Sequence, residues 1–102
     1  MTTTQPEEKL LSQLKQGSPT AVKRWFLEYH QDILRFVLSR VANQADAEEI
    51  VQQTFLSCLK HLPFFNGKST IFTWMLAIAK REVANYFRKK YAKKALQLLP
   101  LS

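Results

Sequence analysis

Hydrophobic residues recur at steps of three and four along most of the chain, which is the spacing of one buried face on an α-helix. Residues that favour turns divide this pattern into four segments. The segments predict a short helix within residues 5–17, a helix of about 20 residues within 18–43, a third over 45–63, and a fourth that begins at Ser69 or Thr70. We therefore expect an all-α fold, a compact bundle of three to four helices.

The ends of the predicted helices carry recognisable signals. Ser18 is a plausible N-cap with Pro19 in the first turn, and either Ser69 or Thr70 can cap the fourth helix. Gly17 and Pro63 end the first and third helices. Asn66 and Gly67 mark a loop between the third and fourth.

Each of the longer helices has a predicted buried face. In the second helix it contains Val22, Trp25, Phe26, Tyr29, Ile33, Phe36, Val37 and Val41. In the third helix it contains Ala47, Ile50, Val51, Thr54, Phe55, Cys58, Leu59 and Leu62. In the fourth it contains Phe72, Met75, Ala79, Val83 and Tyr86, widened by Leu76 and Phe87.

The opposite face of the fourth helix is small, polar and basic. Small side chains let a bulky partner approach, and basic side chains can reach phosphates. An ordinary solvated face is the alternative interpretation. The residues of this face are Thr73, Ala77, Lys80, Arg81, Ala84 and Arg88.

Composition and charge support this view of the fourth helix. The chain has 102 residues, 46% of them hydrophobic, which suits one domain with a real core. The formal net charge is +7, and residues 62–102 hold eight bases against one acid, while bases and acids balance in the rest of the chain. Such asymmetry indicates a polyanionic partner, either nucleic acid or an anionic membrane, or else a solvated basic tail.

Several classes of function find no support in the sequence. His30 and His61 lack partners at ligand spacing, and no glycine-rich phosphate loop is present, so we expect no metal, no cofactor and no enzymatic activity. The lone Cys58 fits a reducing compartment. The N-terminus has no signal-peptide pattern and no apolar run is long enough to span a bilayer, so we expect a cytoplasmic protein without membrane insertion.

Two segments resemble region 2 of bacterial sigma factors of the extracytoplasmic-function (ECF) class. They are "DAEEIVQQTFLSCLKHL", residues 46–62, and "FNGKSTIFTWMLAIAKREVANYFRKK", residues 65–90. The helix that contains "AVKRWFLEYHQDILRFV" fits the first region 2 helix of that family. Arg81 stands where the family often has Asn, which bears on base preference. Ile71, Met75 and Gln53 are further departures.

The resemblance implies a domain organisation. Residues 1–17 would form an N-terminal short helix, and residues 18–94 the region 2 domain. Residues 95–102 would begin a linker to a C-terminal domain, outside this sequence, that reads the promoter −35 element.

The resemblance also implies three groups of functional residues. One would face the clamp-helix coiled coil of core RNA polymerase: Asp46, Glu48, Glu49, Gln52 and Gln53, although ordinary surface polarity also explains them. A second would form a loop that holds a base flipped from the −10 element: Phe64, Phe65, Asn66, Gly67, Lys68 and Ser69. A third would follow the non-template strand and the upstream duplex: Thr73, Ala77, Lys80, Arg81, Ala84, Asn85 and Arg88.

Two aromatic positions of these segments have a structural alternative. We expect at least one of Phe64 and Phe65 to anchor the loop in the core. Trp74 lies at the border of the two faces of its helix, and core packing is favoured over base contact.

The function implied is promoter recognition and opening without catalysis by this chain, with an anti-sigma factor as a further partner. Two alternatives stay open. One is a free-standing basic helical regulator that binds DNA or RNA duplexes. The other is an interaction module that binds no nucleic acid.

Overall fold

The computed structural model describes residues 4–100, with side chains from Glu7 onward. Its elements are the helices α1 (Thr4–Lys15), α2 (Pro19–Leu38), α3 (Gln44–His61) and α4 (Ile71–Gln97), with a short 3-10 turn, η1 (Leu62–Phe64), after α3. No strand occurs in the described part of the chain, so the predicted all-α fold class is confirmed. The outermost residues of the predicted segments 1–17 and 95–102, namely 1–3 and 101–102, lie outside the described residues.

Side-chain caps fix the starts of the three long helices. Ser18 Oγ accepts a hydrogen bond from the Ala21 N–H at 3.2 Å, as the sequence predicts. The Thr70 hydroxyl does the same for the Thr73 N–H at 3.1 Å. The α3 cap, Asn43, was not predicted, because its place at the end of the preceding apolar pattern hid its role as a capping residue.

Gly17 ends α1 in a left-handed conformation with φ of 78°. Its N–H donates to the Leu14 carbonyl at 2.9 Å, and the Ser18 N–H donates to the Gln13 carbonyl at 3.1 Å. These two bonds form a Schellman motif, which satisfies the last carbonyls of α1. The motif leads directly into the Ser18 cap, so α1 and α2 meet at a sharp turn.

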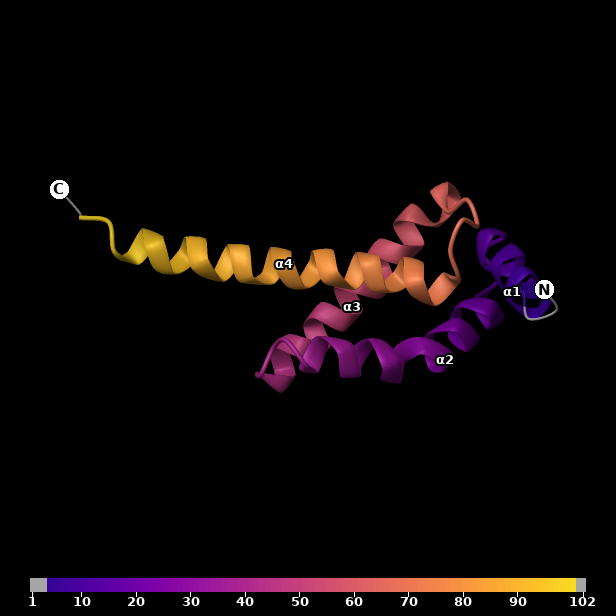
Figure 1. The fold of residues 1–102 in the computed structure, drawn as a ribbon, viewed down its shortest axis with the longest axis horizontal. Coiled ribbons are helices and arrows are strands. Elements are labelled where there is room, and N and C mark those ends of the chain that lie inside the picture. The colour runs from indigo at the N-terminus through magenta and orange to yellow at the C-terminus, as the bar shows by residue number, and fades with distance from the viewer. Residues whose placement is uncertain (1–3, 101–102) are drawn as a thin grey trace.

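The core lies where α2, α3 and α4 pack on one another, and α1 closes one end (Figure 1). At its centre the Trp25 ring meets the Phe55 ring edge-on, with centroids 4.8 Å apart. The Trp25 indole N–H donates to the Met75 sulfur at 3.3 Å, so the buried indole has a partner. Thr54 is buried as well, and its hydroxyl donates to the Ile50 carbonyl at 2.8 Å within α3.

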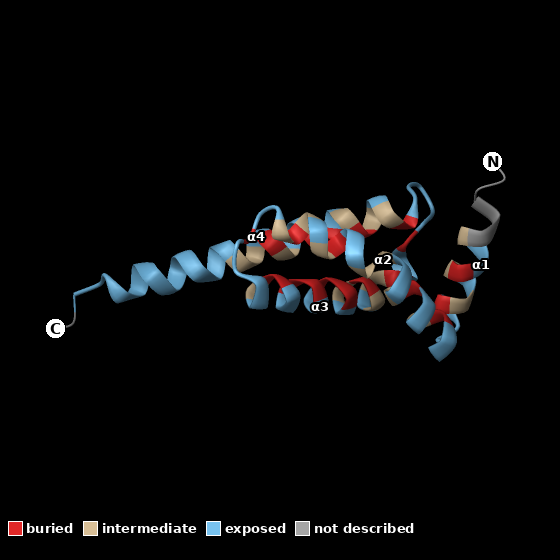
Figure 2. Cartoon of the chain, turned by 90° about the horizontal axis from the view of Figure 1, so that it is seen from below, coloured by how far each residue is buried: buried red, intermediate tan, exposed pale blue. Residues whose placement is uncertain are grey.

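The buried face of α4 differs from the predicted one in two ways. Ile71 and Ile78 are buried, because α4 packs against both α2 and α3 and its buried face is correspondingly wide. Phe87, predicted to widen the core, is 45% exposed. It begins the stretch of α4 over residues 87–97 in which every residue is exposed, and Figure 2 shows the end of α4 projecting past the other helices.

The helix boundaries also bear on the predicted segments. α1 contributes Leu10 and Leu14 to the core, so it is part of the same packed unit as the bundle. α4 continues through residue 94 to Gln97, so the predicted domain boundary falls inside a helix. The final turns of α4 project from the bundle and give the molecule its elongated dimensions of 62 × 25 × 24 Å (Figure 1).

Candidate nucleic-acid interface

The basic face of α4 points to solvent along its whole length. Lys80, Arg81 and Arg88 are exposed, and Asn85 is half-buried. Within residues 7–100 the single ion pair joins Asp32 to Arg35 on α2, so none of the bases of α4 forms an ion pair there. The small and polar members of the predicted face are exposed as well: Thr73, Ala77 and Ala84.

The loop before α4 has one exposed and one buried aromatic ring. Phe64 is 79% exposed, whereas Phe65 is only 7% exposed and packs on the half-buried Trp74, with ring centroids 5.0 Å apart. The expectation that one of the two phenylalanines anchors the loop is therefore confirmed, and Trp74 packs against the core. Because its ring is covered, Phe65 cannot offer a stacking surface to a base. Its predicted place among the loop residues is therefore limited to anchoring the loop.

Polar contacts shape the tip of the same loop. The Asn66 side-chain oxygen accepts a hydrogen bond from the Lys68 N–H at 3.0 Å, and Gly67 between them has φ of 77°. The Ser69 hydroxyl donates to the Thr70 carbonyl at 3.0 Å. Phe64, Asn66, Gly67, Lys68 and Ser69 are all exposed, so the turn presents polar groups to solvent beside one bare ring.

A cavity of about 350 Å³ lies under this loop, on the side that faces α1. Its lining comes from the loop and the start of α4, and from Glu7, Glu8 and Leu11 of α1. Sequence reasoning did not connect these α1 residues with the loop. Their only signal was an acidic first turn, which stabilisation of the helix dipole explains equally well.

The predicted docking residues of α3 differ in how far they are buried. Glu48, Glu49, Gln52 and Gln53 are exposed. Asp46 is half-buried, and its carboxylate accepts a hydrogen bond from the Tyr86 hydroxyl of α4 at 2.7 Å. Asp46 therefore joins α3 to α4 in addition to any role at the surface.

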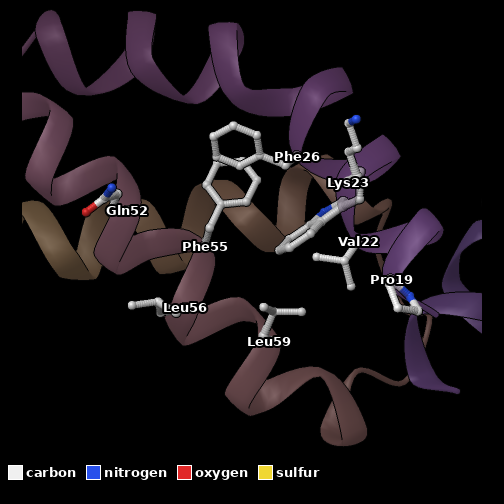
Figure 3. Close-up of a pocket in the computed structure, with 9 residues that line it drawn as sticks. Pro19, Val22, Lys23, Phe26, Gln52, Phe55, Leu56 and Leu59 are labelled. Carbon is white, nitrogen blue, oxygen red and sulfur yellow. The ribbon is translucent and has the colours of Figure 1, made fainter. Parts of the chain in front are cut away.

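An apolar groove of about 700 Å³ opens between α2 and α3, with Gln52 at its edge (Figure 3). Leu56, one turn further along α3, is 59% exposed beside it. Sequence reasoning missed Leu56, although an apolar residue one turn after Gln52 and outside the buried stripe was visible in the pattern. The remaining lining residues are Pro19, Val22, Lys23, Trp25, Phe26, Phe55 and Leu59.

A smaller cavity of about 150 Å³ separates the acidic side of α3 from α4. Glu49 and Gln53 line it from α3, and Asn85 and Lys89 line it from α4. Members of the predicted polymerase-binding and DNA-binding groups therefore line the same cavity, together with Tyr86 and Asp46, which form a hydrogen bond.

The domain that carries these surfaces matches a known family. The family described as Sigma-70 region 2 matches residues 25–92, which is most of the chain. The chain belongs to this family. The resemblance found in the motifs is thereby confirmed, including its ECF class, which the names of three similar proteins state.

Three relatives show how far the similarity to this region 2 domain extends. The chain is 30% identical over 92 residues to "ECF RNA polymerase sigma factor SigC" of Mycobacterium tuberculosis, covering 86% of the chain and 49% of that protein. It is 32% identical over 62 residues to SigX of Bacillus subtilis, covering 61% and 32%. It is 28% identical over 81 residues to BldN of Streptomyces coelicolor, covering 78% and 31%. The chain spans less than half the length of these curated relatives.

The region 2 match covers α3, the loop and the packed part of α4, and it begins at Trp25 within α2. It therefore contains all the predicted site residues. α1 lies before the matched range, although it packs on α2 and lines the loop cavity.

Two side chains inside this region 2 domain have a raised pKa. Burial, with a smaller contribution from Glu82, raises the pKa of the Cys58 thiol to about 12, so the thiol stays protonated and unreactive at neutral pH. Burial also raises the pKa of Tyr29, with smaller contributions from Glu28 and Glu7. No cluster of three potential metal ligands occurs among residues 7–100, and none of the described helices is long and apolar enough to cross a bilayer.

Proposed function

We propose that this chain is the part of an ECF-type sigma factor that binds core RNA polymerase and recognises and melts the promoter −10 element. The observation that carries the proposal is the placement of three exposed surfaces on one packed core. The acidic and amide face of α3, the loop over residues 64–69 and the basic face of α4 are all open to solvent. A partner on α3 leaves the loop and the outer face of α4 available to DNA.

The docking surface on polymerase would be the clamp-helix coiled coil. Glu48, Glu49, Gln52 and Gln53 supply exposed carboxylates and amides for it, and Leu56 adds an apolar side chain among them. Interfaces of this kind take most of their affinity from a few buried apolar or aromatic anchors with polar residues around them. The groove beside Gln52 and Leu56 gives such an anchor room to pack.

The basic face of α4 would follow the non-template strand and the upstream duplex. Lys80, Arg81 and Arg88 are free to contact phosphates, which position a strand without reading its sequence. Ala84 lies between Arg81 and Arg88, and Ala77 lies one turn before Arg81; these small exposed side chains allow the backbone of the strand to come close to the helix. Thr73 adds an exposed hydroxyl that can form hydrogen bonds with sugars or bases, and the half-buried Asn85, which lines the small cavity toward α3, adds an amide at the border of this face.

The loop at the start of α4 would capture a flipped base of the −10 element. Phe64 offers an exposed ring for stacking, and Asn66, Lys68 and Ser69 offer hydrogen-bonding groups around it. Unstacking a base costs a few kcal/mol, and stacking on an aromatic ring returns roughly 1–3 kcal/mol. Capture therefore stabilises the melted promoter, and strand opening needs no catalysis and no cofactor from this chain.

This role places the chain in the cytoplasm, where polymerase and promoter are found. The same exposed surfaces would be the ones that an anti-sigma factor covers to keep the domain away from polymerase.

The deciding experiment measures binding of the chain to core RNA polymerase, with and without a single-stranded −10 oligonucleotide of the non-template strand. We expect binding to polymerase, and tighter capture of the −10 strand than of a scrambled strand in the complex. Glu49→Lys with Gln53→Lys should weaken polymerase binding at least about tenfold, because charged groups of the wrong sign at an interface cost several kcal/mol.

Glu28→Lys with Gln31→Lys is the matched control, since it makes the same two types of substitution on the exposed surface of α2. If the α3 variant binds polymerase as tightly as the control variant does, the proposed docking face is wrong.

A free-standing regulator that binds DNA or RNA duplexes is the second candidate, favoured by the unneutralised bases of α4. It predicts binding without polymerase, a preference for duplex over single strands, and affinity that falls steeply with salt. An interaction module without nucleic acid predicts instead that Lys80→Ala, Arg81→Ala and Arg88→Ala leave the affinity for every oligonucleotide unchanged.

A further inference from the structure

Helix α1 contacts both ends of the loop that precedes α4. The Glu7 carboxylate accepts a hydrogen bond from the Ile71 N–H at 3.2 Å. The Lys15 ammonium donates to the Phe65 carbonyl at 3.1 Å. Phe65 and Ile71 are the residues where the loop leaves the 3-10 turn and enters α4, so α1 holds the loop at its first and last positions.

Both hydrogen bonds satisfy backbone groups that the secondary structure leaves without partners. Ile71 is the first residue of α4, and the N–H groups of a first helical turn have no carbonyl partner within the helix. The Thr70 hydroxyl caps the Thr73 N–H, which leaves the Ile71 N–H to Glu7. A negative side chain at this position is also favoured by the helix dipole.

The position of α1 is fixed by the core. Leu10 and Leu14 are 3% and 5% exposed, so one side of α1 is embedded in the bundle. Glu7, Leu11 and Lys15 follow one another at steps of four and lie along one side of the helix. Glu7 and Lys15 are about 12 Å apart along its axis, and Leu11 between them lines the cavity under the loop.

We infer that α1 is a clamp that holds the loop over residues 64–69 in the shape needed to capture a base, with Glu7 and Lys15 as positioning residues. The inference rests on the proposed function of the loop. A preordered loop loses less conformational entropy when it binds, so it binds more tightly and discriminates better between bases. Without the clamp the loop keeps its side chains but not their arrangement, so base discrimination falls while polymerase docking and phosphate contacts persist.

The first measurement is hydrogen exchange of the backbone amides in the free chain, which needs neither DNA nor polymerase. In the wild-type chain we expect the Ile71 amide to be protected. Glu7→Ala should speed its exchange by about tenfold or more, since one hydrogen bond to a charged acceptor is lost. Glu7→Gln should restore much of the protection, because the amide oxygen still accepts a hydrogen bond although the charge is gone.

The second measurement is the affinity ratio between the −10 strand and a scrambled strand, in the complex of the full chain with core RNA polymerase. Glu7→Ala and Lys15→Met should each lower this ratio several-fold and leave polymerase binding unchanged. Lys9→Met is the matched control, because Lys9 is an exposed lysine of the same helix and the substitution removes the same charge. Thermal melts of all variants check that the bundle stays folded.

The outcomes separate the clamp from the function on which it rests. If Ile71 exchanges equally fast in the wild-type and Glu7→Ala chains, the clamp does not exist. If exchange changes but the ratio stays at its wild-type value, α1 is structural and the positioning role is wrong. If the wild-type complex shows no preference for the −10 strand, the proposed function fails and base positioning fails with it, while the exchange data still report whether α1 holds the loop.

Discussion

The two parts of α4 share one continuous helix but differ in nearly every other respect. Over residues 71–86 the helix buries Ile71, Met75, Ile78, Ala79 and Val83 against α2 and α3. Over residues 87–97 every residue is exposed, including large apolar side chains. Figure 2 shows the change of environment along the helix.

The change occurs at Tyr86, whose hydroxyl donates to the Asp46 carboxylate near the start of α3. Beyond that point α4 has no neighbouring helix. The exposed part is helical because Ala, Lys, Leu and Gln have high helix propensity, not because of packing. Helix formation and burial are thus separate properties here: the first depends on the local sequence, the second on the length of the partner helices.

The largest effect on the free energy of unfolding is expected when one apolar residue from each part of α4 is replaced and the two variants are compared. Met75→Ala should lower the free energy of unfolding by about 2–5 kcal/mol, because it opens a cavity in the core and leaves the Trp25 indole N–H without its acceptor. Leu96→Ala, at a residue 66% exposed, should stay within about 0.5 kcal/mol. Urea denaturation of both variants measures the pair, and equal destabilisation would remove the distinction between the two parts.

A substitution at Tyr86, where the two parts of α4 meet, should have an intermediate effect on the free energy of unfolding. Tyr86→Phe removes the hydrogen bond to Asp46 while leaving the ring in place, and it should cost about 1.5 kcal/mol. The same measurement on Tyr91→Phe is the control, because Tyr91 is 76% exposed on the projecting part. A Tyr86→Phe chain as stable as the Tyr91→Phe chain would show that the contact with α3 does not stabilise this end of the bundle.

The bases of the two parts can be compared by their effect on DNA binding in the polymerase complex. If Lys80 and Arg81 contact phosphates as proposed, Lys80→Ala with Arg81→Ala should weaken −10 strand binding about tenfold near 0.2 M salt, with a salt slope lower by about 1.4. Lys93→Ala with Lys94→Ala removes the same charge from the projecting part and should have a smaller effect. Affinity measured over a series of salt concentrations checks both, and equal losses would point to general charge attraction in place of a defined face.

The smallest effect is expected from removing most of the projecting part. A chain that ends at Lys90 should have a free energy of unfolding within about 0.5 kcal/mol of that of the full chain, because residues 91–100 are all exposed. Far-UV circular dichroism should show the loss of helical signal that the shorter α4 implies. A large loss of stability would mean that residues 91–102 contact the bundle.

Much of this molecule could be predicted from its sequence. The order of the helices, the cap at Ser18, a cap at either Ser69 or Thr70, and the outward direction of Lys80, Arg81 and Arg88 all followed from local patterns, while the sigma region 2 family followed from the resemblance of the motifs. Such patterns suffice because capping and apolar periodicity depend on residues within a few positions of one another.

Errors arose where burial depends on a partner. Phe87 was expected to widen the buried face of α4, yet it is 45% exposed and begins the part of α4 that packs on no other helix. Ile78 lies outside the predicted stripe, yet it is buried because α4 packs on two helices at once. Periodicity along one helix contains no information on how far, or on how many sides, its neighbours extend.

The sequence by itself determined which segments are helical, which of their faces are apolar and where the positive charge collects. Only the tertiary structure decided that Asp46 meets Tyr86, 40 positions away, and that Glu7 reaches the Ile71 amide, 64 positions away. The physical reason is that helix propensity and capping act within a turn or two of chain, whereas these contacts exist only once the bundle has brought distant segments together.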